Sequence, residues 1–548
     1  MKKVYFLFSL LFFNFISCTT VFNSKECVVL DKTKSFSSQV TNSDTVYIIE
    51  DSYNLGNETV NLPNNIILRF EGGSLIGGNL KFNNTYLANY VDLRCNHYSG
   101  QISNKEINLG WFYFPELDTN GNEVITENFK VPGFSKILTV NKAEIIECCA
   151  SRTLLVDRLY AVDKGINIKK DITLKGYDVN EGIYGNMIQN AKYGFFNCTI
   201  GPVNNAPLFD VQAGASVSVY GVCFITDVGR FNSYIWDSQL LNGNKLSHPF
   251  LSYGLNIHPG AAIKEIHDSS FVGCTYGIKV SGGSIGIIKN SYFSLNRYGI
   301  WIENTNDFTL TGCRFNSNLS QYQFSSKSYK DVNTPTKEND AKDITKLGGG
   351  VYFKNVNNSL IKDCRFEFDF IGFILDEAGK NITLEDSIFD SGTISQIFIF
   401  NSSDPSNTVK TSYPSIENVV IQNNTMARGV KCRTGSNSSE PGYCFLYIAE
   451  GDNRGSEITF KNNCMSDDIE IDTNLEKNYE QANVFIYNTS NNTGKLNLTG
   501  NDFLQTKAKY KYKVVDGSYG SYTIDETGTV FGTDEMSNIN NVLVLTHN

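Results

Sequence analysis

Asp268-Ser269-Ser270-Phe271 begins a series of near-copies that decides the fold. Asn290-Ser291-Tyr292-Phe293 and Gly312-Cys313-Arg314-Phe315 repeat it, with 22 residues between successive Phe residues. After 51 and then 23 more residues, Asp363-Cys364-Arg365-Phe366 and Asp386-Ser387-Ile388-Phe389 repeat it again. Weaker copies end at Met426, Met465 and Phe503. A short, fixed repeat is typical of a solenoid, in which each coil contacts only its neighbours.

A second motif recurs with the same period and predicts β-strands. It alternates apolar and polar residues after a Gly, as in Tyr253-Gly254-Leu255-Asn256-Ile257. A coil of about 22 residues has room for three short strands and three turns. The pattern lacks the leucine-rich repeat signature and is too short for a propeller blade, which needs about 40 residues. We therefore predict an all-β, right-handed parallel β-helix with three short strands per coil. Four further copies support this: Tyr276–Val280, Tyr298–Ile302, Gly350–Phe353 and Gly372–Leu375.

Small or amide side chains occupy the position two residues before each Phe or Met of the first motif. We expect them to stack inside the solenoid at one turn, each hydrogen-bonded to its neighbour in the next coil. Two of them are cysteines, which this position explains as small interior residues and not as metal ligands or nucleophiles. The full set is Ser269, Ser291, Cys313, Cys364, Ser387, Asn424, Asn463 and Asn501.

The N-terminus has the features of an export signal. Met1-Lys2-Lys3 precedes an apolar run from Val4 to Ile16, which is shorter than the roughly twenty residues of a transmembrane helix. Phe15-Ile16-Ser17-Cys18 resembles the lipobox of bacterial lipoproteins, in which the Cys is acylated. We therefore predict a signal peptide over 1–17, a lipidated tether over 18–40, a β-helix over 41–505 and a C-terminal β capping segment over 506–548. A lipid at Cys18 would anchor the protein to a membrane, and we expect the outer membrane of the cell envelope.

The stretch from Leu62 to Phe82 has the same texture of strands and turns as the coils from Tyr253 to Phe400. Together they resemble the pectate-lyase-like β-helix proteins, and the N-terminal part looks like the members found as lipoproteins in Bacteroidota. The resemblance implies a pectin-lyase-like fold and a polysaccharide partner. It is carried by the repeat pattern, because the catalytic motifs of polygalacturonases and of calcium-dependent pectate lyases are not found.

Outward-facing positions of the second motif form two rows along the solenoid axis. Glu303 and Asp376 lie two coils apart, roughly 9–10 Å, near the upper end of carboxyl spacings in inverting glycosidases. We take these two as the candidate catalytic pair. Trp301 and Tyr352 would form a flat strip for stacking sugar rings. The row of Asn256, Lys279, Trp301, Tyr352 and Ile374 lies beside the row of His258, Ser281, Glu303, Lys354 and Asp376.

We take Asn256, His258, Lys279 and Lys354 as further substrate-binding candidates. Two alternatives remain open at this point. One is a plain solvated sheet on which Glu303 pairs with Lys354 for stability alone, and the other is a face whose aromatic strip is covered by a loop. The insertions Thr226–Ser252 and Asn316–Gly349 interrupt the repeat beside this sheet, and loops of a solenoid often border its binding face.

Composition and motifs limit the other partners. The net charge of −10 and the pI of about 5.2 argue against binding to nucleic acid. His258 and His267 fall on different sheets, so we expect no shared metal site, and no motif predicts a cofactor. Cys432 and Cys444 share a Gly/Ser-rich loop, and the sequence leaves their pairing open.

The predicted function is that of a cell-envelope lipoprotein that binds a polysaccharide in a groove on one parallel sheet. Whether it is a lyase or glycoside hydrolase stays open, since fold alone does not determine activity. The alternatives are a non-catalytic glycan-binding adhesin and a purely structural surface protein.

Overall fold

The computed structural model describes residues 25–112, 138–140, 143–149, 152–157, 159–162, 165–176, 194–197, 207–225, 253–316, 318, 348–369, 371–390, 395–401, 416–427, 444–450, 457–466, 482–488, 494–505, 510–516, 523–531 and 542–546. Cys18 with the predicted signal peptide, Cys432 and most of both long insertions lie outside the described residues.

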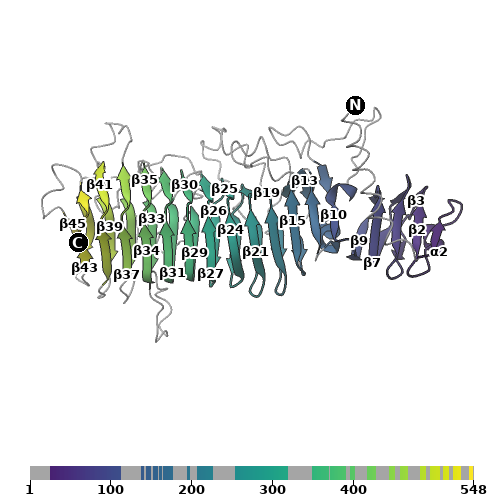
Figure 1. The fold of residues 1–548 in the computed structure, drawn as a ribbon, viewed down its shortest axis with the longest axis horizontal. Coiled ribbons are helices and arrows are strands. Elements are labelled where there is room, and N and C mark those ends of the chain that lie inside the picture. Colours follow the sequence, from purple (N-terminus) through teal and green to yellow (C-terminus); the bar gives the residue numbers. More distant parts are fainter. Residues whose placement is uncertain are drawn as a thin grey trace, which may run out of the picture.

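The strands stack along one long axis, from the N-terminal coils in purple to the C-terminal coils in yellow (Figure 1). Each strand of a coil pairs in parallel with its equivalent in the next coil. The predicted all-β parallel β-helix is therefore confirmed. In one coil the strands are β20 (Tyr253–Ile257), β21 (Ala262–His267) and β22 (Ser270–Val272), and in the next β23 (Tyr276–Ser281), β24 (Ser284–Lys289) and β25 (Tyr292–Ser294).

The β-helix has three long faces. We call first face the sheet surface that contains β17 (Phe209–Val211), β20, β23 and β26 (Tyr298–Glu303). It continues into the first halves of β29 (Gly349–Lys362) and β31 (Ile371–Glu385). The second halves of these two strands belong to the neighbouring face, because positive φ angles at Asn355 and Glu377 turn the chain between them.

The core is a continuous column of apolar side chains. On the first face, every second residue points inward and is fully buried, including Leu255, Ile278 and Ile300. On the face of β22 and β25, the repeated Phe residues stack ring on ring with centroids 4.5–5.1 Å apart. Burying one such ring stabilises the fold by about 1.5–3 kcal/mol. The stack contains Phe271, Phe293, Phe315, Phe366 and Phe389.

The predicted internal ladder is confirmed. All eight of its residues are buried. The Ser387 backbone N–H donates to Oδ1 of Asn424 at 2.9 Å, and that of Asn424 donates to Oδ1 of Asn463 at 3.0 Å. Asn463 continues in the same way to Asn501 at 3.0 Å. Cys364 follows the rule too, since its N–H donates to the Ser387 hydroxyl at 3.0 Å.

A second internal ladder was not predicted. Asn296 donates its backbone N–H and side-chain amide to Oδ1 of Asn318, at 3.1 Å each. Asn318 donates in the same way to Oδ1 of Asp369, at 2.8 and 2.9 Å. The other carboxyl oxygen of Asp369, Oδ2, is buried and has no hydrogen-bond partner. Burial raises the pKa of this carboxyl well above its ordinary value.

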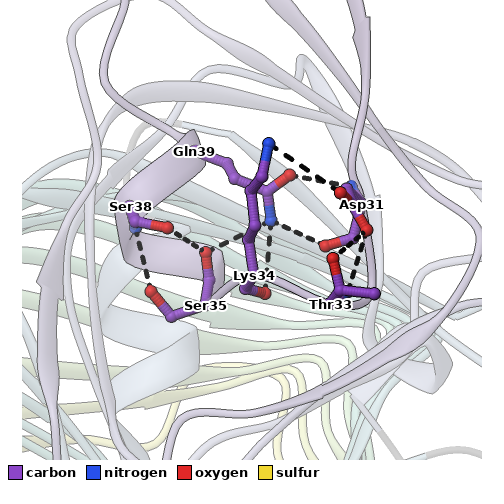
Figure 2. Close-up of polar contacts among 6 residues, drawn as sticks. All are labelled: Asp31, Thr33, Lys34, Ser35, Ser38 and Gln39. Atoms are coloured by element: carbon purple, nitrogen blue, oxygen red, sulfur yellow. Dashed lines mark hydrogen bonds and ion pairs between the residues drawn. The ribbon is translucent and has the colours of Figure 1, made fainter.

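The N-terminal end differs from the prediction. Residues 25–40, placed in the tether, form part of the solenoid: β1 (Cys27–Val29) pairs with β2 (Val46–Ile49), and helix α2 (Phe36–Gln39) buries Phe36. Figure 2 shows how this segment is fixed. The Asp31 N–H donates to Gln39 Oε1 at 2.7 Å, and Gln39 Nε2 returns to the Asp31 carbonyl at 3.0 Å. Apolar anchors between the polar residues were too sparse to reveal this structure from sequence.

The C-terminal segment continues the same ladders. β42 (Tyr510–Asp516) pairs with β39 (Ala482–Asn488) and then with β45 (Val542–Thr546), all on the first face. β43 (Thr523–Asp525) and β44 (Val530–Phe531) extend the other two faces. The predicted boundary at residue 505 is therefore not a change of architecture, because the coil pattern runs on to Thr546.

Candidate functional site

The first face brings the predicted site residues into the expected register. Asn256, Lys279, Trp301 and Tyr352 occupy matching positions in four successive coils. In the adjacent row, Ser281, Glu303, Lys354 and Asp376 also match. His258 follows β20 directly and so begins this second row. The face divides into a buried end near Asp376 and a partly exposed end near His258.

At the buried end, the predicted aromatic platform is not open to solvent. Trp301 and Tyr352 stack with ring centroids 3.5 Å apart and are only 6% and 1% exposed. Trp301 Nε1 donates to Glu303 Oε1 at 2.5 Å, and the Tyr352 hydroxyl donates to Asp376 Oδ2 at 2.5 Å. Both polar tips are thus satisfied within the protein. The expectation of a sugar-stacking strip at these two residues was wrong, since both rings are buried, and Tyr298 packs edge-on against each of them.

Asp376 is buried as well, at 2% exposure. Burial raises its pKa to about 7, although the hydrogen bond from Tyr352 acts in the opposite direction. A carboxyl that titrates near neutral pH has the acidity that a general acid needs. It has no access to a substrate from this position, however, so the pair of Glu303 and Asp376 is not brought together at one exposed site.

Lys354 does not form the ion pair with Glu303 that the alternative of a plain solvated sheet contained. Its ammonium lies 2.7 Å from Glu377 Oε1, on the residue that follows Asp376. Burial lowers the pKa of Lys354, but the hydrogen bond and charge of Glu377 outweigh this effect and raise the pKa overall. Glu377 was not predicted because it lies at the bend of β31, where a positive φ takes its side chain out of the simple alternation.

The partly exposed end contains a polar cluster around Asp210. Its Oδ1 lies 2.8 Å from His258 Nε2 and accepts a hydrogen bond from Asn256 Nδ2 at 2.7 Å. Its Oδ2 accepts from Gln212 Nε2 at 2.6 Å. The side chains of His258 and Asp210 are 41% and 24% exposed. Asn256 and His258 were predicted, and the structure places both in this cluster.

Beside the cluster lie Tyr253 and Tyr276, which are partly exposed and stack with centroids 5.2 Å apart. Lys279 Nζ lies 5.8 and 5.3 Å from the centres of these rings. Tyr276 also contacts Trp301 edge-on, so it connects the exposed end of the first face to its buried end. Burial raises the pKa of Tyr276 to about 12, which keeps its hydroxyl protonated at neutral pH.

Sequence reasoning missed Asp210, Gln212, Tyr253 and Tyr276. The signal for Asp210 was present, because Phe209-Asp210-Val211 has the same alternation as Leu255-Asn256-Ile257 and pairs with it. The long insertion between these two strands hid the repeat. The tyrosines begin their strands, where the alternation of inward and outward residues had not yet started.

His258 and His267 lie on different faces, as expected from the repeat. His267 pairs with Glu265 in β21, with Nε2 and Oε2 3.1 Å apart. Within the described ranges, no group of three His, Cys, Asp or Glu residues is placed to hold a metal ion. No helix in the part of the chain that the structure describes is long and apolar enough to cross a membrane.

Comparison with known proteins adds only distant likenesses. No protein-family model and no curated protein matches the sequence. Among solved structures, the Dettilon tailspike protein is 11% identical with a TM-score of 0.43, covering 81% of this chain and 68% of its own. A double mutant of the tailspike of E. coli bacteriophage HK620 is 12% identical with a TM-score of 0.47, covering 78% and 67%. A mutant of that tailspike in complex with a pentasaccharide is 11% identical with a TM-score of 0.40, covering 78% and 67%. Likeness at this level does not establish a shared activity.

Proposed function

We propose that this protein is a lipid-anchored cell-envelope protein that binds a polysaccharide along the exposed end of the first face. The observation that carries the proposal is the strip of Tyr253, Tyr276 and Lys279 beside the cluster of Asn256, His258 and Asp210. Aromatic rings next to fixed hydrogen-bonding groups are what sugar rings require, because a sugar has both apolar faces and many hydroxyls.

The strip also suits a long, regular ligand. Coils repeat about every 4.8 Å along the axis, so a chain lying along the face meets similar positions again and again. The cluster presents acceptors on Asp210 and donors on Asn256 and Lys279, all partly exposed. A neutral or mildly charged sugar chain fits this mixed set better than a polyanion, given the acidic side chains on the same face.

Burial favours binding at this end over chemistry at the predicted pair. Asp376 and Tyr352 bond to each other beneath the surface, so the Glu303–Asp376 version of a lyase or glycosidase lacks an exposed acid. Tyr253, Tyr276 and Lys279 are all partly exposed, which leaves this strip open to a ligand. Such a strip would serve a glycan-binding protein, whether it is an adhesin or an enzyme.

The test is a polysaccharide panel, scored for binding and for new reducing or unsaturated ends. Tyr253→Ala and Lys279→Met should each weaken binding of the selected glycan by about tenfold or more, as expected for anchor residues of an interface. Tyr90→Ala is the matched control, because Tyr90 is 92% exposed and lies far along the chain in the N-terminal coils. The proposal fails if no glycan binds, or if both site variants bind like the control.

A further inference from the structure

We infer that the first face hydrolyses glycosidic bonds with His258 and Glu303 as its proton-transfer pair, and that Asp210 is the positioning residue for His258. This inference rests on the proposed function and adds an activity to the same site. It replaces Asp376, which is buried, with a group at the other end of the row that solvent reaches.

The hydrogen bond to Asp210 orients the imidazole of His258. A carboxylate oxygen only accepts hydrogen bonds, so Nε2 of His258 must be the protonated nitrogen that donates to Asp210 at 2.8 Å. The Asn256 amide also lies 3.1 Å from Nε2, but it is a donor and its hydrogen bond goes to Asp210. Nδ1 is therefore the atom that gains or loses a proton at this site.

The carboxylate that orients the imidazole is itself fixed. His258, Asn256 and Gln212 supply one donor each to Asp210. A carboxylate held by three donors cannot rotate away without breaking several hydrogen bonds. Such a partner sets the tautomer of a histidine and stabilises its protonated form during a reaction.

The register of the strands sets the spacing between His258 and Glu303. His258, Ser281 and Glu303 occupy the second row in three successive coils, since Ile257 pairs with Val280 and Ser281 with Glu303. His258 and Glu303 are thus two coils apart, roughly 9–10 Å at the backbone. This spacing lies at the wide end of the roughly 6.5–9.5 Å that an inverting glycosidase uses to admit a water, and Asp210 holds His258 from the preceding coil, on the side away from Glu303. The small side chain of Ser281 leaves room between them.

Glu303 is held in place by a hydrogen bond and is partly exposed. Its Oε1 accepts the hydrogen bond from Trp301, which fixes the carboxylate while the residue remains partly exposed. Lys354 does not neutralise it by a direct ion pair, because that ammonium lies at Glu377. A carboxylate that is fixed and partly exposed is suited to accept a proton from water.

Nδ1–H of protonated His258 transfers its proton to the glycosidic oxygen, and the bond from that oxygen to the anomeric carbon breaks. A water on the opposite face of the sugar forms the new carbon–oxygen bond while Glu303 takes its proton. Proton return from Glu303 to His258 through solvent restores both groups. The products are two shorter glycans, and the new reducing end has inverted anomeric configuration.

The experiment uses the full-length protein and the glycan selected by the panel, with binding and turnover measured separately. His258→Gln and Glu303→Gln should each reduce kcat at least 100-fold, a loss much larger than any change in the Kd. Asp210→Asn should lower kcat and alter its pH profile, because it changes the partner of the imidazole and not the imidazole itself. NMR of the fresh product should show the inverted anomer.

His267→Gln is the matched control, since His267 also pairs with a carboxylate but lies on another face. It should leave kcat and the pH profile unchanged. If the wild-type protein binds a glycan but releases no product, or if His258→Gln keeps its turnover, the inference is overturned and the binding proposal stands. If no glycan binds at all, both fail. Thermal melts of each variant separate misfolding from loss of function, and Asp210→Asn, which keeps the shape of the cluster, decides the case if His258→Gln unfolds.

Discussion

Asp369 stands where the Asn296–Asn318 ladder requires an amide. In the two preceding coils, the side-chain nitrogen at this position donates to a backbone carbonyl, at 3.0 Å from Asn296 to Phe271 and at 3.1 Å from Asn318 to Phe293. At Asp369 the corresponding oxygen is buried and has no hydrogen-bond partner. This agrees with the raised pKa of Asp369, because burial without a partner disfavours the charged carboxylate.

We predict that Asp369→Asn stabilises the protein at pH 7 by about 1–3 kcal/mol, the usual cost of an unsatisfied buried group. In the wild type, the unfolded chain ionises near the ordinary pKa of 3.8, whereas the folded acid stays protonated to a higher pH. Stability therefore falls as the pH rises above about 4, until the raised folded pKa is reached. Denaturant unfolding at pH 4 and pH 7 measures the effect, and the gain of the variant should shrink at pH 4.

Asp307→Asn provides the control for this prediction. Asp307 begins an exposed amide ladder and accepts from Asn358 Nδ2 at 3.0 Å, in contact with solvent. Its substitution should change stability little and equally at both pH values. A gain at pH 7 that persists undiminished at pH 4 would show that Asp369 is ionised in the folded protein.

At the scale of elements, the repeated motifs predicted strands well and bends poorly. The position two before each Phe identified the internal ladder because a buried turn admits only small side chains or self-pairing amides. The long strands β29 and β31 were not foreseen as continuous across two faces. Their bends depend on single positive φ angles at Asn355 and Glu377, which leave no trace in a pattern of apolar residues.

The same ladder gives an element-scale prediction. Asn463→Ala removes the acceptor for two donors of Asn424, each at 3.0 Å, and the donor to the Ile421 carbonyl at 3.1 Å. Leaving these buried groups unpaired should destabilise the protein by about 2–4 kcal/mol. Urea unfolding followed by circular dichroism measures the change. Asn497→Ala is the control, since Asn497 faces outward with one weak contact of 3.3 Å to Thr459, and it should cost less than about 0.5 kcal/mol. Equal losses in both variants would show that the ladder adds nothing beyond surface amides.

At the scale of the whole molecule, the sequence predicted the architecture because a solenoid repeats one local solution many times. Each copy of the Phe motif is weak evidence, but copies in register reinforce one another. The site was harder to predict, since exposure depends on how side chains from different coils pack. Register alone placed Trp301 and Tyr352 correctly, yet it gave no sign that both rings would be buried. Asp210 became visible only when folding brought β17 beside β20.

The anchor is the property of the whole molecule that the sequence predicts and the described residues do not reach. If Cys18 is acylated, the lipid chains add about 0.8 kcal/mol of membrane affinity for each buried methylene. Cys18→Ser should therefore move the protein from the detergent-extracted membrane fraction into the soluble fraction, and the mass of the N-terminal peptide should lose its acyl groups. Cys27→Ser is the control, because Cys27 is an exposed free thiol in β1 and its loss leaves the anchor intact. Equal membrane association of Cys18→Ser and the wild type would refute the lipoprotein assignment, whereas release of Cys27→Ser as well would point to a fold-dependent association through the first coil.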